Sequence, residues 1–119
     1  QGTFHYHSGY NYFRNAGNRI LLGGARHLDL KGETTTKEGI NSRLENQLKE
    51  DLKCFIAPKR PLEIDYAWSG IMAFGEGKAP LLLHPSPHVH AAVRLGGMGV
   101  ALGTGLGKEL AQHVGATTS

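Results

Sequence analysis

A row of glycines spaced four residues apart constrains this chain more than any other feature of its sequence. Gly99, Gly103 and Gly107 recur in a segment that also carries apolar side chains at intervals of four. These apolar positions are Met98, Leu102, Leu106 and Leu110. The two stripes together predict a helix. Because each glycine inside a helix costs about 1 kcal/mol relative to alanine, we expect another group to lie very close to this backbone.

The turn before that helix, Gly96-Gly97-Met98-Gly99, is the most chemically suggestive feature. A helix start leaves its first amide N–H groups unpaired and carries partial positive charge, so it can receive an anion or a partly negative oxygen. The glycines would let a flat or phosphorylated ligand approach the main chain. A tight turn between a strand and a packed helix has the same spacing, and the residues alone leave both interpretations open. The segment contains no G-x-G-x-x-G, and Gly107-Lys108-Glu109 does not form a P-loop.

The N-terminal 25 residues have the alternation of strands. Aromatic side chains alternate with other residues from Phe4 to Tyr12, as in a half-buried strand. The tetrapeptide Asn15-Ala16-Gly17-Asn18 separates residues 12–14 from residues 19–22 and supplies residue types that tolerate positive φ. The pattern predicts a β-hairpin.

The middle of the chain predicts an amphipathic helix over about residues 36–53. Thr35 and Glu38 have the spacing of a capping box. Apolar residues then follow every four positions: Ile40, Leu44, Leu48 and Leu52. Glu45 and Lys49 are four apart in the orientation that favours an ion pair.

Three further strands complete the expected elements. The clearest alternation is that of Leu62, Ile64, Tyr66 and Trp68 with polar or small residues. Residues 81–83 predict a short apolar strand, and residues 89–93 alternate as another strand. The chain is therefore expected to be α+β: mainly antiparallel sheet with one amphipathic helix packed on it and a C-terminal helix after the glycine-rich turn.

Composition narrows the class of protein. The 119 residues suffice for one domain, and 17 glycines are about twice the usual share of roughly 7%. With 13 basic and 10 acidic side chains and no run of five like charges, we expect no nucleic-acid partner. No segment approaches the roughly 18 to 20 apolar residues of a membrane span. The single cysteine, Cys54, is expected to be a buried small apolar group and fits a cytoplasmic location. Because the chain begins at Gln1, we expect a piece of a longer polypeptide.

The sequence gives little support for a metal site or for nucleophilic catalysis. His84, His88 and His90 are close in sequence, but zinc needs three or four ligands and no cysteine or acidic residue lies nearby in the sequence, so no metal is expected. Ser69 lacks the first glycine of a nucleophile elbow. Arg14 and Arg94 are candidate carboxylate binders, since the guanidinium fork suits a carboxylate; each could equally be a solvated strand arginine.

Three segments in this order resemble the C-terminal part of the D-amino-acid oxidase and glycine oxidase-like FAD-dependent oxidoreductases. The first is Tyr12-Phe13-Arg14 leading to Arg19–Gly24, the second is Ile64–Met72, and the third is Val93–Gly103. Each segment alone is weak, but their order covers about residues 10–114 and makes the resemblance fairly specific.

The resemblance implies a domain organisation. Residues 1–95 would be a substrate-side antiparallel sheet domain with the helix of about residues 36–53. Residues 96–114 would be a glycine-rich turn and C-terminal helix that return to an N-terminal FAD-binding domain. Residues 115–119 would be a frayed tail.

The resemblance also implies cofactor and substrate residues. Five residues would lie at the flavin: Gly96, Gly97, Met98, Gly99 and Val100. The substrate would be a small amine or amino acid, with Arg14, Arg94 and Tyr12 as candidates for holding its carboxylate. No cysteine is present near residues 70–72, so the FAD would be non-covalent.

Activity would belong to the complete protein. The N-terminal G-x-G-x-x-G unit of the family is not in this chain, so the chain alone would be inactive, free of FAD, and prone to self-association through its apolar helix. The alternative is a non-enzymatic domain that binds a small ligand or another protein.

Overall fold

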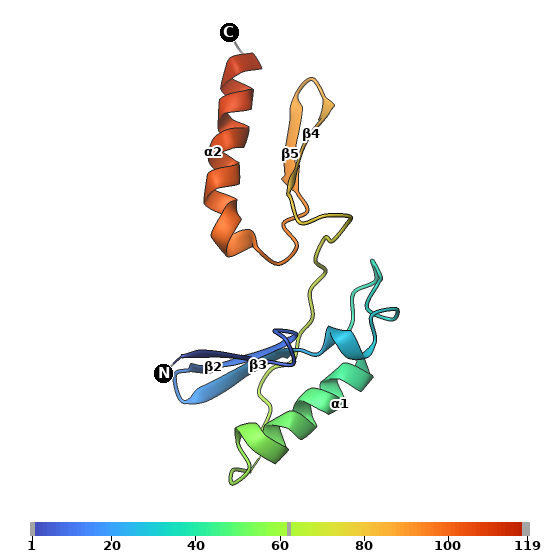
Figure 1. The fold of residues 1–119 in the computed structure, drawn as a ribbon, viewed down its shortest axis with the longest axis vertical. Coiled ribbons are helices and arrows are strands. Elements are labelled where there is room, and N and C mark those ends of the chain that lie inside the picture. Colours follow the sequence, from blue (N-terminus) through green and yellow to red (C-terminus); the bar gives the residue numbers. More distant parts are fainter. Residues whose placement is uncertain (1, 62, 118–119) are drawn as a thin grey trace. The chain divides into compact units, whose positions relative to one another are not determined.

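The computed structural model describes residues 2–61 and 63–117. The chain divides into two compact units, Gln1–Gly70 and Ile71–Ser119, shown in Figure 1. Each unit contains an antiparallel sheet and an α-helix. The predicted α+β class is confirmed. The proposed functional boundary at Gly96 remains a prediction.

The first unit is built on a three-stranded antiparallel sheet in the order β1-β2-β3. Its strands are β1 (Thr3–Tyr6), β2 (Asn11–Ala16) and β3 (Arg19–Gly24). Ala16 pairs with Arg19, so Gly17 and Asn18 form a two-residue loop. Gly17 has a φ of 63°, a conformation that glycine adopts without steric cost. The predicted hairpin is confirmed.

The helix of the first unit, α1, spans Ser42–Asp51 and is followed by a π-helical turn, η2 (Leu52–Ile56). Its N-cap is Asn41, whose side-chain oxygen accepts from the Arg43 amide at 3.1 Å. The predicted start at residue 36 is wrong. The Thr35 hydroxyl oxygen instead accepts from the Lys37 amide at 3.0 Å, a local turn that competes with helix formation.

Asn41 caps the helix because other residues hold its side chain. The Asn41 amide donates to the carboxylates of Asp29 and Glu33, each at 3.0 Å. These acceptors come from the segment after the short 3₁₀ helix η1 (Arg26–Leu28). Along α1 the predicted pair of Glu45 and Lys49 is confirmed, with 2.8 Å between Nζ and Oε1.

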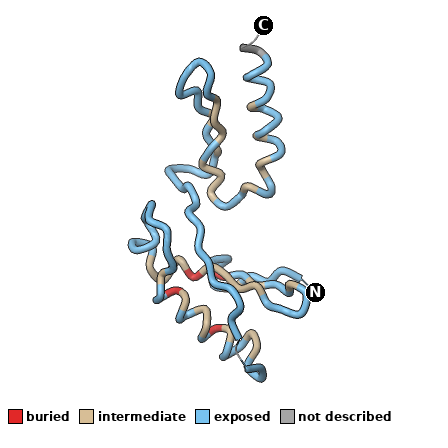
Figure 2. Tube along the Cα trace, turned by 180° about the vertical axis from the view of Figure 1, so that it is seen from behind, coloured by how far each residue is buried: buried red, intermediate tan, exposed pale blue. Residues whose placement is uncertain are grey.

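The interior of the first unit is small and partly polar. Among the described residues only four are buried, as Figure 2 shows. They are Ala25, Leu44, Asn11 and Asp51. The Tyr6 hydroxyl donates to the Asp51 carboxylate at 2.6 Å, and the Asn11 amide donates to the Tyr6 oxygen at 3.0 Å. This cluster joins α1 to the sheet, because Asp51 lies on the helix and its two partners on strands.

The strand predicted over residues 62–68 is not formed within the described residues 63–68, while Leu62 lies outside the described residues. Tyr66 and Trp68 are 72% and 71% exposed. The Asp65 carboxylate instead forms an ion pair with the Arg19 guanidinium, with 3.1 Å between Oδ2 and Nε. The same guanidinium lies 5.6 Å from the centre of the Tyr66 ring. Alternation predicts an extended segment, but a strand also needs a neighbour to pair with.

The second unit contains a hairpin and the C-terminal helix. The hairpin consists of β4 (Leu81–Ser86) and β5 (Val89–Val93), paired antiparallel. Both predicted strands are confirmed, and β4 extends three residues beyond the predicted end at Leu83. The register shifts between Leu83 and Ser86, which indicates a bulge or irregularity.

The helix α2 spans Gly99–Thr117 and packs against β5. The predicted helix after the glycine turn is confirmed. The predicted fraying from Gly115 is wrong for residues 115–117, which remain helical; residues 118–119 lie outside the described part. Cys54, predicted to be buried, is exposed on η2, because this turn leaves the end of the helix away from the small core.

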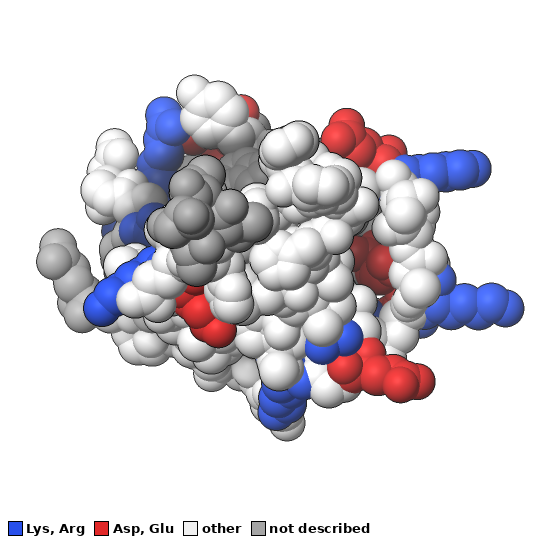
Figure 3. Space-filling view, turned by 90° about the horizontal axis from the view of Figure 1, so that it is seen from above, with Lys and Arg blue, Asp and Glu red and all other residues white. Residues whose placement is uncertain are grey.

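Charged side chains of both signs are mixed on the surface, in agreement with the modest net charge. On the face shown in Figure 3, basic and acidic side chains are interspersed around uncharged surface. Among the described residues, no helix is both long and apolar enough to cross a bilayer.

Candidate functional site

A hollow of about 450 Å³ opens at the glycine-rich turn of the second unit. Three segments line it: Met72–Ala73, Val93–Gly97 and Gly99–Val100. The end of β5 and the start of α2 therefore face the same space. Of the five residues predicted to bind a cofactor, Gly96, Gly97, Gly99 and Val100 line the hollow, whereas Met98 does not.

The two glycines of the turn are required by the backbone. Gly96 has a φ of 56° and Gly97 a φ of 85°, the left-handed region that most residues avoid. A Cβ at Gly97 would lie 3.8 Å from the Met72 sulfur, and one at Gly96 would lie 3.9 Å from the Phe74 ring. Since these are ordinary contacts, the reason for glycine here is conformation, and the bare main chain faces the hollow as a result.

The start of α2 adds backbone N–H donors to the lining of the hollow. The Met98 carbonyl accepts from the amides of Ala101 at 3.1 Å and Leu102 at 2.9 Å, so Met98 is the residue at which the helical bonding begins. The amides of Gly99 and Val100 precede that ladder, at the end of the helix that carries partial positive charge. No acidic side chain occupies the first turn. The wall suits a negatively charged or oxygen-rich group.

Arg94 is a strained residue at the edge of the hollow. Its φ is 62°, uncommon outside glycine, asparagine and aspartate and often found at functional sites. Its guanidinium donates from Nε and Nη2 to the Ala79 carbonyl at 3.2 and 2.8 Å. Arg94 therefore fastens the loop before β4 to the end of β5. Part of its donor fork is already used within the chain.

The other two predicted substrate residues lie in the first unit. Arg14 is exposed on β2, and its Nη1 donates to the Asn15 carbonyl at 3.2 Å. Tyr12 pairs with Gly23 across the sheet, and a Cβ at Gly23 would lie only 2.7 Å from the Tyr12 hydroxyl oxygen. The Tyr12 ring thus covers Gly23.

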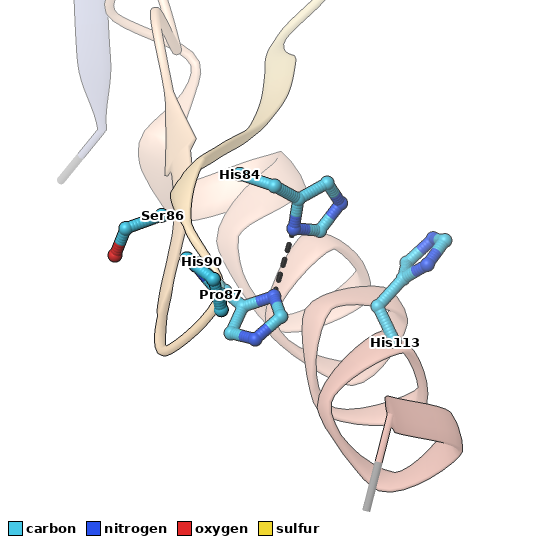
Figure 4. Close-up of a pocket in the computed structure, with 5 residues that line it drawn as sticks. All are labelled: His84, Ser86, Pro87, His90 and His113. Carbon is cyan, nitrogen blue, oxygen red and sulfur yellow. Dashed lines mark hydrogen bonds between the residues drawn. The ribbon is translucent and has the colours of Figure 1, made fainter.

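A cluster of histidines that the sequence only partly indicated lies elsewhere in the second unit. His84 and His90 point toward one another, with 2.7 Å between their Nδ1 atoms. His113 of α2 lies beside them, as Figure 4 shows. His88, which the sequence grouped with the pair, does not line their hollow. No short-range pattern connects His113 with His90 and His84, which lie 23 and 29 positions earlier in the chain; only the packing of α2 does.

Comparison with known proteins gives one result at the level of a family. No curated protein and no solved structure matches the chain significantly. A family model described as DAO, FAD dependent oxidoreductase, matches residues 2–113. This match includes most of each unit and all the residues that line the glycine-turn hollow. The chain therefore belongs to the DAO family of FAD-dependent oxidoreductases.

Proposed function

We propose that this chain is the substrate-side and flavin-facing part of an oxidoreductase of the D-amino-acid oxidase and glycine oxidase type. The reaction would be oxidation of the C–N bond of an amino acid or secondary amine. The observation that carries the proposal is the hollow at Gly96–Val100, where bare backbone and the start of α2 face the same space.

The residues of this hollow fit one part of FAD. A flat ring system needs a wall without protruding side chains, and the left-handed glycines Gly96 and Gly97 supply it. When bound, the flavin supplies a hydride acceptor. The amides of Gly99 and Val100, at the positive end of α2, would then stabilise negative charge on the reduced ring.

The remainder of FAD needs residues from another part of the protein. The chain contains no G-x-G-x-x-G turn for a pyrophosphate. We propose that an N-terminal FAD-binding domain holds the adenine and the pyrophosphate non-covalently. The chain alone would then be colourless and inactive.

The carboxylate of an amino-acid substrate would be held by an arginine. Arg14 is the better candidate, because it is exposed and directs one donor at the Asn15 carbonyl, whereas Arg94 directs two donors at the Ala79 carbonyl. Tyr12, on the same strand and partly exposed, would contribute a hydroxyl. A guanidinium binds a carboxylate through two parallel hydrogen bonds, which would favour amino acids over simple amines.

The flavin contact is tested with two glycine variants of the complete polypeptide. Gly97→Ala should lose most of the bound flavin, because the turn in the wall would be distorted. Gly77→Ala is the matched control: Gly77 has a similar φ of 77°, a Cβ there meets nothing within 4 Å, and it does not line the hollow. Visible absorbance per polypeptide is the measurement. Equal flavin content in the two variants, or a wild-type polypeptide that takes up no FAD, would contradict the proposal.

The substrate class is tested separately. In the flavin-loaded protein, Arg14→Gln should lower kcat/KM at least tenfold for the best amino-acid substrate and leave flavin content unchanged. An amine of similar shape that lacks a carboxylate should be oxidised equally well by both forms. If Arg14→Gln affects both compounds alike, carboxylate binding by Arg14 is refuted.

A further inference from the structure

The segment that precedes β4 lies against the glycine turn. A Cβ at Gly97 would lie 3.8 Å from the Met72 sulfur, and one at Gly96 would lie 3.9 Å from the Phe74 ring. The two segments meet at the end of the β4–β5 hairpin that lies away from its turn (Figure 1). Met72 and Ala73, which line the hollow, thus form a second wall beside the glycine turn. The shape of the hollow depends on how this segment is held.

The side chain of Arg94 holds the segment at two points. Its Nε and Nη2 donate to the Ala79 carbonyl at 3.2 and 2.8 Å. Nearer the Arg94 backbone, Cδ lies where a side chain on Gly75 would begin, since a Cβ at Gly75 would be 2.9 Å from that carbon. The loop from Gly75 to Ala79 therefore has both of its ends on one side chain. Met72 and Ala73 directly precede this loop, so the same side chain restricts where they lie.

The backbone of Arg94 indicates that its side chain is needed at this position. Its φ of 62° is similar to those of Gly96 and Gly97, at 56° and 85°. In this left-handed region glycine is unstrained, whereas an arginine is strained. Strained residues persist where the surrounding structure holds them, and they cluster at functional sites. The contacts of the Arg94 side chain give a reason for an arginine where the conformation suits glycine.

Gly75 is the counterpart of Arg94 in this contact. Its φ lies outside the left-handed region, so its backbone conformation does not require glycine. The Arg94 side chain does require it, because Cδ and Nη1 lie 2.9 and 3.1 Å from the place of a Cβ. An alanine at Gly75 must displace the middle of the arginine side chain. The same contact can therefore be broken from either residue.

We infer that Arg94 is a positioning residue, which fixes the segment before β4 as the second wall of the glycine-turn hollow. The inference rests on the proposed function for its ligand, the flavin ring. Without the contacts to Gly75 and Ala79, Met72 would leave its place against Gly97, and the hollow would lose its fixed shape. A site that is already ordered loses less conformational freedom on binding. Loss of the contacts should therefore weaken flavin binding.

The contact itself is tested by NMR of the 119-residue chain without flavin, with isotope-labelled methionine methyl groups. The chain contains two methionines, Met72 and Met98, and of these Met72 alone lines the hollow. Arg94→Asn removes the contacts and introduces a residue that tolerates left-handed backbone. It should move the Met72 methyl resonance toward its position in the unfolded chain and leave Met98 in place. Gly75→Ala should move Met72 in the same direction, and it keeps the test decisive if Arg94→Asn does not fold.

Gly70→Ala is the matched control. The φ of Gly70 also lies outside the left-handed region, and a Cβ there would meet nothing within 4 Å. This variant should move neither resonance by a comparable amount. A merely structural role of Arg94 would move both methionines together, because the fold as a whole would loosen. The inference is overturned if Met72 stays in place in the Arg94 and Gly75 variants, or if Met98 moves as far as Met72.

The consequence for the cofactor is tested in the complete polypeptide by titrating the flavin-free form with FAD. Arg94→Asn and Gly75→Ala should each weaken FAD binding at least tenfold, and Gly70→Ala should leave it unchanged. A wild-type polypeptide that takes up no FAD would contradict the proposed function, while the NMR result would still decide whether Arg94 holds the second wall. If the wild type binds FAD and both variants bind it as tightly, Arg94 is not a positioning residue of the flavin site.

Discussion

At the scale of single residues, the Tyr6 hydroxyl is the most perturbed group of the first unit. Burial, followed by the hydrogen bond to the Asp51 carboxylate, raises the pKa of Tyr6 from 10.0 to about 12. The Asn11 amide, which donates to the Tyr6 oxygen, acts in the opposite direction. The Gln47 amide donates to the other Asp51 oxygen at 2.8 Å. The proton on Tyr6 is thus part of what holds α1 on the sheet.

Because the fold depends on this proton, the stability of the first unit should fall at high pH. The folded state keeps the proton better than the unfolded state, so the stabilisation is fully present below pH 10 and is lost as the pH rises toward 12. At neutral pH, Tyr6→Phe should cost about 1.5–3 kcal/mol, as for other hydrogen bonds to charged groups. It should also remove most of the fall in stability between pH 10 and 12. Urea unfolding at several pH values measures both effects.

Tyr66→Phe is the control for this experiment. Tyr66 is 72% exposed, so its replacement should leave the pH profile as it is in the wild type. A Tyr6→Phe variant whose stability declines with pH as steeply as that of the wild type would show that Tyr6 is not the responsible group.

At the scale of elements, the start of α1 depends on Asn41. Asn41→Ala should destabilise the chain by about 1 kcal/mol, the usual cost of losing an N-cap. Thr35→Ala should have almost no effect, because Thr35 makes only a local turn before the helix. Denaturant unfolding compares the two variants. If Thr35→Ala is the more damaging variant, the helix begins earlier than Ser42.

The Asn41→Ala variant should also change the pKa of the Asp29 carboxyl. The Asn41 amide is the largest cause that lowers the pKa of the Asp29 carboxyl, and the Gly32 amide is the next. Removing the Asn41 side chain should therefore raise the Asp29 pKa toward its ordinary value. An NMR titration of the carboxyl resonance measures this change. An unchanged titration would mean that Asn41 does not bind Asp29.

The glycine stripe of α2 gives a prediction for the helix that we propose faces the flavin. A Cβ at Gly103 or Gly105 would meet nothing within 4 Å, so alanine at either position should stabilise the helix of this chain by about 1 kcal/mol. In the complete enzyme the two should differ. Gly103→Ala should weaken flavin retention if its stripe packs closely on the FAD-binding domain, whereas Gly105→Ala, on another face, should not. Equal behaviour in the complete enzyme would refute close packing on the stripe.

At the scale of the whole molecule, large apolar side chains are exposed in both units. Trp68 in the first unit is 71% exposed, and Met98 in the second is 54% exposed. Exposed apolar surface promotes association, so we expect the chain to self-associate in a concentration-dependent manner. Trp68→Ser and Met98→Ser should each weaken association severalfold in sedimentation experiments, while Lys37→Ser should not. A chain that stays monomeric at high concentration would contradict this expectation.

Much of the candidate site followed from the sequence, and the remainder depended on distant partners. Gly96, Gly97 and Gly99 were identified from their position between a strand and a helix, and they line one hollow. The contact between the Arg94 guanidinium and the Ala79 carbonyl could not be predicted from local pattern, because the two residues are 15 positions apart. Met98 was grouped with its neighbours by sequence alone, but its side chain does not line the hollow.

The sequence by itself determined the elements whose causes act between neighbouring residues. The Gly17-Asn18 loop, the existence of strands at residues 81–83 and 89–93, and the helix from Gly99 follow from turn chemistry and periodicity. Only the tertiary structure decided where α1 begins, that residues 63–68 remain unpaired, and that His113 joins His84 and His90. Each of these depends on a partner far along the chain, and local pattern contains no information on whether such a partner is within reach.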